Sequence, residues 1–350
     1  MMRILILLVA LLPGAFPALA QDSLAIRVNV GLVNVTFTAR DASGRLVGDL
    51  TKDDIEILDD GAPQTISFFA RSEDLPLSLG LIADVSGSQD PFLKKHHHDL
   101  DEFLKRVLTQ KDRAFLVCFG NHVRLVSDFS SKRERLIDSL KDFDGKQRNG
   151  PYPDLGPKER RILGTAFYDA LYLATAHLAT PDKLVNDGPP DEKPFDESVD
   201  EKSVRQKIVD NSGTAPAGPG RRALIVFSDG EDNSSSHHML DAIEAAQSAD
   251  AVIYGIRYTE IDKRGLNARN KYGTSVMNRI GRETGGRDFD AEKTDTKKAF
   301  AEIGEELRSS YELGYHSANQ DGTFHKLLIR AKRPGIVIRA KTGYFAREGS

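Results

Sequence analysis

The sequence predicts a doubly wound α/β domain with a mostly parallel, Rossmann-like sheet, inserted in a small all-β sandwich domain built from both chain ends. Between residues 76 and 310, short apolar runs alternate with stretches of helical spacing, as in right-handed β-α-β crossovers. Residues 21–75 and 311–350 instead show alternating apolar and polar residues between turn signals, which indicates strands. We therefore expect the two flanking regions to pack together.

The individual elements follow from the same patterns. Strands are expected at 28–37, 55–58, 65–69, 77–83, 113–119, 123–129, 223–227, 251–258, 311–316, 325–331 and 336–341. Helices are expected at 90–108, 131–143, 165–179, 238–249, 275–284 and 294–309. Turns are expected at Asp41-Ala42-Ser43-Gly44, Asp59-Asp60-Gly61 and Asp321-Gly322.

The first twenty residues have the pattern of a cleaved signal peptide. Arg3 precedes the apolar run 4–12, and Ala18-Leu19-Ala20 fits a signal-peptidase site. The run is short for a membrane anchor, and no later run is long enough to span a bilayer. We expect export to the periplasm or the extracellular space, with no transmembrane span after cleavage.

The composition suits a globular protein with a core. The chain has 350 residues, 39% of them hydrophobic, and its net charge of −4 argues against nucleic acid as a partner. A single cysteine, Cys118, cannot form an internal disulfide and lies in an apolar run, so we expect it to be buried. Residues 181–221 are rich in proline, glycine and charged residues, which predicts a disordered acidic insertion.

Oxygen-bearing side chains follow two of the predicted strands. The segment Asp84-Val85-Ser86-Gly87-Ser88 comes directly after strand 77–83, and Asp229 follows strand 223–227. Thr165 begins a predicted helix and can reach the same edge. Ligands of doubly wound folds bind beyond the carboxyl ends of the strands, and carboxylates with hydroxyls suit Mg²⁺, Mn²⁺ or Ca²⁺. The sequence therefore predicts a site for one divalent cation.

These motifs resemble the von Willebrand factor A (VWA) domain with a metal-ion-dependent adhesion site, over about residues 76–310. Asp84, Ser86 and Ser88 match its first motif, Thr165 its second loop and Asp229 its third. The resemblance implies a bound cation, Mg²⁺ before Mn²⁺ or Ca²⁺. It also implies an open coordination position that an aspartate or glutamate of a partner protein fills.

Nearly the whole mature chain is similar to the VWA-related proteins typical of Acidobacteria. The similarity lies in Val30 to Asp41, Asp60-Gly61 with Gln64, Tyr311 with Leu313-Gly314-Tyr315, Asp321-Gly322 with Phe324-His325, and Gly343-Tyr344. Gln89 stands where many such domains have Met, and Leu163 replaces the first glycine of a Gly-Gly-Thr loop. Neither change removes a metal ligand, although the second could shift Thr165.

Other polar residues near these motifs are weaker candidates. Asp90, Asp232 and Asn233 are expected either to hydrogen-bond the metal's ligands or waters without binding the ion itself, or to cap turns and helices. His96-His97-His98 cannot grip one ion from one helix, because consecutive residues point about 100° apart. We expect these histidines on a solvated helix surface.

The leading functional hypothesis is a secreted, metal-dependent protein-binding module rather than an enzyme. The chain has no phosphate-binding loop, no Gly-x-Ser-x-Gly elbow and no His-Glu-x-x-His motif, and no catalytic residues are assigned. Two alternatives stay open. One is a metal-assisted hydrolase, since a metal-bound water is a nucleophile. The other is a structural envelope protein with a vestigial metal site.

Overall fold

A computed structural model describes residues 31–143, 154–155, 164–179, 185–186, 220–259 and 265–346. The expected signal peptide lies outside these residues, and so does nearly all of the expected insertion 181–221. None of the described helices is long and apolar enough to cross a membrane.

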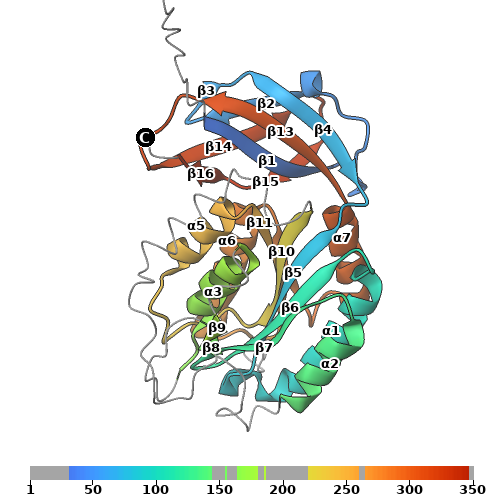
Figure 1. Cartoon of the computed structure of the whole chain (residues 1–350), viewed down its shortest axis with the longest axis vertical. Coiled ribbons are helices and arrows are strands. Elements are labelled where there is room, and N and C mark those ends of the chain that lie inside the picture. The colour runs from blue at the N-terminus through green and yellow to red at the C-terminus, as the bar shows by residue number, and fades with distance from the viewer. Residues whose placement is uncertain are drawn as a thin grey trace, which may run out of the picture.

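A mixed sheet of eight strands forms the centre of the α/β part, in the order β12-β11-β10-β5-β6-β7-β8-β9 (Figure 1). The strands from β12 to β6 pair in parallel, and β7 to β9 are antiparallel. Their bounds are β5 Leu77–Asp84, β6 Arg113–Phe119, β7 Val123–Ser130, β8 Asp154–Leu155, β9 Val185–Asn186, β10 Arg221–Ser228, β11 Ala251–Arg257 and β12 Arg287–Asp290. The predicted α/β class with a mostly parallel sheet is confirmed.

Helices cover both faces of this sheet (Figure 1). One apolar cluster joins the strands to α3 (Phe167–Ala179), α5 (Met239–Ser248) and α6 (Ala268–Thr284). A second cluster on the other face joins them to α1 (Leu93–Val107), α2 (Arg133–Asp142) and α7 (Thr296–Arg308). Because both faces are covered, the central strands are buried along their whole length, as their near-continuous apolar sequences indicate.

Two four-stranded sheets lie at one end of the molecule, above the α/β part in Figure 1. Their strand orders are β15-β1-β13-β4 and β16-β14-β2-β3, so each sheet combines strands from both chain ends. A shared apolar cluster includes residues from both sheets. The bounds are β1 Gly31–Arg40, β2 Ile55–Asp59, β3 Ala62–Pro63, β4 Ile66–Glu73, β13 Ser309–Ser317, β14 Phe324–Ala331, β15 Val337–Ala340 and β16 Gly343–Phe345.

A buried glutamate of α7 joins these sheets to the α/β part. Glu306 is fully buried, and its Oε1 accepts hydrogen bonds from Arg40 of β1 at 2.8 Å and Arg339 of β15 at 3.0 Å. Its Oε2 accepts from the Tyr254 hydroxyl of β11 at 2.8 Å. One carboxylate therefore contacts two strands of the two four-stranded sheets, together called the β region, and one strand of the central sheet.

Several boundaries differ from the sequence-based prediction. Helix α6 begins at Ala268, seven residues before the expected start, because the Asn267 side chain caps it by accepting from the Asn270 amide. Helix α2 begins at Arg133, two residues after the expected start, and Lys132 is its N-cap residue. The expected helix 90–108 is divided into the 3₁₀ turn η2 (Gly87–Phe92), which contains Pro91, and α1. The short strands β3, β12 and β16 were not predicted, since brief strands carry little periodicity.

Candidate metal centre

The first and third predicted motifs meet at the carboxyl edge of the central sheet. Strand β5 ends at Asp84 and its neighbour β10 ends at Ser228, and the register pairs Phe227 with Ala83. The Ser228 hydroxyl donates to Asp84 Oδ2 at 2.6 Å, and the Asp84 side chain is fully buried. The parallel pairing therefore places the two loops side by side, as expected from the strand order.

The loop after β5 connects the first motif to Asp229. The backbone amide of Ser86 donates to Asp84 Oδ1 at 2.9 Å, and the Ser86 and Ser88 hydroxyl oxygens are 3.2 Å apart. The Ser88 hydroxyl donates to Asp229 Oδ2 at 2.8 Å. Four of the five predicted ligand residues are thus joined by hydrogen bonds, through the Ser86 amide and the two serine hydroxyls.

Thr165 lies in an adjacent loop that is bound to both neighbouring loops. Its amide donates to Asn233 Oδ1 at 2.7 Å, and its carbonyl accepts from the Asn233 amide at 3.1 Å. The next residue, Ala166, donates its amide to the carbonyl of Gly120 at 2.7 Å. Within the described part of the chain, the Thr165 hydroxyl forms no hydrogen bond with the other four ligand residues. The structure therefore places the Thr165 loop beside the loops that follow β6 and β10.

The three weaker candidates have different environments. Asp232 Oδ1 accepts from the amides of Phe167 at 2.9 Å and Tyr168 at 3.3 Å, so it caps the start of α3. Asn233 fixes the Thr165 backbone. Asp90 is exposed in η2, and we find no hydrogen bond from it to the other site residues that the structure describes. Asp232 and Asn233 thus position the Thr165 loop.

Gln89 and Ser228 belong to the site, although the sequence did not single them out as site residues. The buried Gln89 amide donates to Asp229 Oδ2 at 2.8 Å. Ser228 binds Asp84 and also accepts from the Gly230 amide at 3.0 Å. The sequence offered only weak indications of these roles. Gln89 is a polar residue directly after the first motif, and Ser228 is a hydroxyl residue directly before Asp229.

The charge of Asp229 makes ionisation of Asp84 less favourable. Burial, together with the nearby charge of Asp229, raises the pKa of Asp84 to about 7, against the opposing hydrogen bonds from Ser228 and Ser86. Glu231 also has a raised pKa, because of burial and the Asp229 charge. A cation bound between the carboxylates would relieve this repulsion, and the hydroxyl oxygens are suitable hard donors. The residues therefore fit a Mg²⁺-type ion.

The expectation that all three histidines of 96–98 are solvated was wrong for His96. His96 is buried, and its ring lies 4.4 Å from the Tyr258 ring, while His98 is exposed. Burial lowers the pKa of His96 to about 3, so its imidazole is neutral. The helix turns His96 toward the apolar face of the sheet because it falls on the same stripe as Leu100 and Phe103. It supplies no positive charge to the site.

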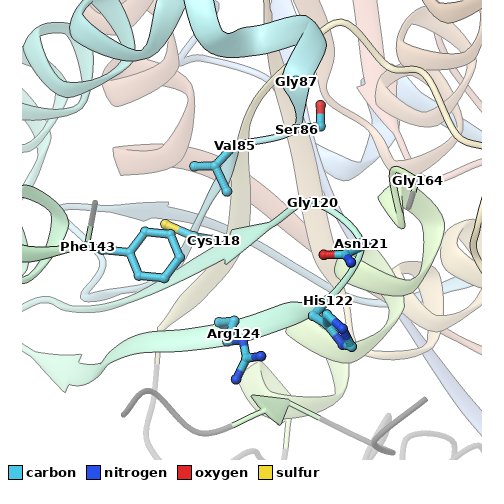
Figure 2. A pocket seen from close by; sticks show the side chains of 10 residues that line it. All are labelled: Val85, Ser86, Gly87, Cys118, Gly120, Asn121, His122, Arg124, Phe143 and Gly164. Atoms are coloured by element: carbon cyan, nitrogen blue, oxygen red, sulfur yellow. The ribbon is translucent and has the colours of Figure 1, made fainter. Parts of the chain in front are cut away.

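A hollow of about 180 Å³ lies beside Ser86 (Figure 2). The β5 loop lines one side, and the turn Gly120-Asn121-His122 between β6 and β7 lines another. Its remaining lining residues are Cys118, Arg124, Phe143 and Gly164. Cys118 is buried, as predicted. A group that reaches this edge of the sheet from solvent would therefore have space beside Ser86.

Comparison with known proteins gives partial structural likenesses. No protein-family model matches the chain, and no curated protein matches its sequence. One similar solved structure is an aerotolerance-related membrane protein from Bacteroides fragilis, with 14% identity, a TM-score of 0.41, and coverage of 66% of this chain and 98% of that one. Another is manganese-loaded TRAP protein from Plasmodium vivax, with 12% identity, a TM-score of 0.39, and coverage of 81% and 98%.

BatB from Bacteroides thetaiotaomicron is similar at the same level. Its identity is 16% and its TM-score 0.37, and the likeness covers 65% of this chain and 97% of that one. Likenesses with these scores describe part of the arrangement of strands and helices. They transfer no ligand and no activity to this chain.

Proposed function

We propose that the carboxyl edge of the central sheet binds one divalent cation, with Mg²⁺ preferred over Mn²⁺ or Ca²⁺. The ligand residues are Asp84, Ser86, Ser88, Thr165 and Asp229. The observation that carries the proposal is the hydrogen-bonded chain from Asp84 through the two serines to Asp229. It brings two carboxylates together beside hydroxyl oxygens, which is a donor set for a hard cation.

The bound cation would hold an aspartate or glutamate of a partner protein. Two carboxylates and three hydroxyls supply five donors, one fewer than the six of an octahedral Mg²⁺ site. An acidic side chain from outside is a suitable further ligand, and the hollow beside Ser86 leaves space for its neighbours. The protein would then be a VWA-type, adhesion-like binding module, and no catalytic residue is required.

The proposal extends to domain organisation and location. We infer that the α/β part, about residues 76–310, is inserted in a β-sandwich formed by the two four-stranded sheets. The mixing of strands from both chain ends in each sheet supports this. The signal-peptide pattern of residues 1–20 supports export to the periplasm or the extracellular space.

Calorimetric titration tests the metal site. The mature chain is titrated with Mg²⁺, Mn²⁺ and Ca²⁺, and Asp84→Ala is expected to weaken binding by roughly 100-fold because it removes an anionic ligand. Asp90→Ala is the matched control, since Asp90 is an exposed carboxylate only six residues away. The metal proposal fails if the native chain binds none of the three ions.

Capture of partners from an envelope extract tests the binding role. We expect the native chain to retain acidic partner proteins in Mg²⁺, and chelator or Asp84→Ala to release them. Capture that is unchanged by chelator would instead favour a structural role. Turnover of a substrate that needs the metal and disappears in Asp84→Ala would favour a hydrolase.

A further inference from the structure

A second group of metal-ligating side chains lies in the β region, where β2 and β14 pair. Asp59 ends β2, Asp60 follows it, and His325 lies in β14. The register places Asp59 opposite Leu327, and the buried positions of β14 alternate through Leu327 and His325. Asp59 and His325 therefore lie on the same buried face of the paired strands. One ligand atom from each of these three residues lies within 4.8 Å of the other two.

Asp59 has one oxygen with hydrogen-bond partners and one without. Its Oδ2 accepts from the hydroxyls of Tyr344 at 2.8 Å, Tyr315 at 2.9 Å and Ser317 at 3.1 Å. Its Oδ1 is buried without a partner among the described residues, and the residue is only 3% exposed. Asp59 also forms no ion pair within the described part of the chain. A buried carboxylate oxygen of this kind is costly unless a cation or a donor satisfies it.

The surroundings of the His325 ring match those of a metal ligand. Its Nε2 lies 3.0 Å from Asp321 Oδ1, and its Nδ1 lies 2.8 Å from Asp60 Oδ2. Metal-bound imidazoles usually donate the other ring N–H to a carboxylate, which orients the ring. Asp321 lies beside Nε2 and takes this orienting position. Nδ1, which faces Asp60, is then the nitrogen that would bind the metal.

We propose that Asp59, Asp60 and His325 bind a divalent transition-metal ion, preferably Zn²⁺, with Asp321 orienting the His325 ring. One imidazole and two carboxylates suit Zn²⁺ better than Mg²⁺, which prefers an all-oxygen shell. Ligand bonds of about 2.0–2.2 Å place tetrahedral donors roughly 3.3–3.6 Å apart, so the three groups need only a small closing movement. The side-chain nitrogen of Asn319 lies 2.8 Å from Nδ1, and a metal bound at Nδ1 would replace this contact. This site is separate from the one at Asp84.

The competing interpretation is a metal-free ion cluster. In it, His325 is doubly protonated and pairs with both Asp60 and Asp321. That arrangement satisfies the ring but leaves Asp59 Oδ1 without a partner. Zn²⁺ binding would satisfy this oxygen, whereas a metal-free ion cluster predicts no binding of Zn²⁺ at these residues. The two interpretations therefore differ in a measurable property.

The test uses the full mature chain carrying Asp84→Ala, so that the first site does not contribute. Zn²⁺ is titrated by calorimetry, and Co²⁺ is added as a spectroscopic probe whose visible absorption reports coordination geometry. We expect one equivalent of Zn²⁺ to bind and to raise the unfolding temperature. Adding Asp60→Asn or His325→Ala should weaken binding by roughly 100-fold, and Asp321→Asn by roughly 10-fold.

His316→Ala is the matched control, because His316 is an exposed histidine of strand β13 in the other four-stranded sheet. It should leave Zn²⁺ binding and the Co²⁺ spectrum unchanged. Asp60→Asn preserves side-chain volume at a half-exposed position, so it remains informative if His325→Ala does not fold. The proposal is overturned if the Asp84→Ala chain binds no Zn²⁺, or if Asp60→Asn leaves its affinity unchanged.

Discussion

Asp84 is a buried acid whose charge has no cationic partner among the described residues. The hydroxyl of Ser228 and the amide of Ser86 stabilise its ionised form, but burial and the Asp229 charge outweigh them. The nearby His96 is neutral and contributes no compensation. This residue therefore reduces the stability of the metal-free protein at any pH above about 4, where it ionises in the unfolded chain.

The pH dependence of stability follows from this. Asp84 ionises near pH 4 in the unfolded chain and near pH 7 in the folded, metal-free chain. Between those values the folded state holds the extra proton, so its free energy of unfolding falls as pH rises from about 4 to about 7. In chelator, Asp84→Asn should therefore be more stable than the native chain at pH 8, by about 1–3 kcal/mol.

Urea denaturation at pH 5 and pH 8 checks this expectation. The advantage of Asp84→Asn should be smaller at pH 5, because only the first part of the fall in stability between pH 4 and pH 7 has occurred there. Asp90→Asn serves as the control and should change stability little at either pH. An equal effect of Asp84→Asn at both values would contradict the assigned cause.

At the scale of elements, the start of α3 depends on the loop that follows β10. Asp232 caps the Phe167 and Tyr168 amides, and Asn233 holds the Thr165 backbone. Gly164 has φ 137°, and a Cβ there would lie 2.8 Å from Asn233 Oδ1, so the two loops fit closely. The helix cap therefore also sets the position of a proposed metal ligand.

Asp232→Ala should affect both stability and metal binding. Loss of the cap is expected to lower the free energy of unfolding by about 1–2 kcal/mol. It should also weaken Mg²⁺ binding several-fold, because Thr165 is no longer held in place. Asp138→Ala on the surface of α2 is the control, since its contact is an exposed pair with Lys141. Unchanged Mg²⁺ affinity in a destabilised Asp232→Ala protein would show that the cap does not position Thr165.

At the scale of the whole molecule, the β region and the α/β part are joined through buried polar contacts. Glu306 on α7 binds Arg40 and Arg339 of the β region, as well as Tyr254 of the central sheet. A second junction lies at α5 and α6, where the Thr342 amide donates to the carbonyl of Glu283 at 3.0 Å. These contacts make the relative position of the two parts sensitive to single changes.

Glu306→Ala should destabilise the whole chain. The change removes the buried carboxylate that Arg40 and Arg339 bind. Breaking a buried ion pair lowers the free energy of unfolding by about 3–5 kcal/mol. Urea denaturation monitored by circular dichroism measures the loss. Glu305→Ala is the control, because Glu305 is exposed on the same helix. A loss of similar size in both variants would show that the junction is not responsible.

The sequence by itself determined the class of the central sheet and the edge at which the candidate ligands gather. Apolar runs identify the strands, and the carboxyl ends of adjacent parallel strands share an edge, so Asp84 and Asp229 are expected to be close once the class is known. Turn and capping chemistry likewise suggested the ordinary role that Asp232 has.

Only the tertiary structure decided which distant side chains meet. Periodicity describes local conformation, but it does not indicate that Gln89 reaches Asp229, that His96 turns inward, or that His325 lies beside Asp60, 265 residues away in the chain. Such contacts depend on strand order and register, which pair β2 with β14 across almost the whole chain. The physical reason is that strand pairing determines which side chains of two strands come into contact. The sequence of one strand alone does not specify which other strand pairs with it.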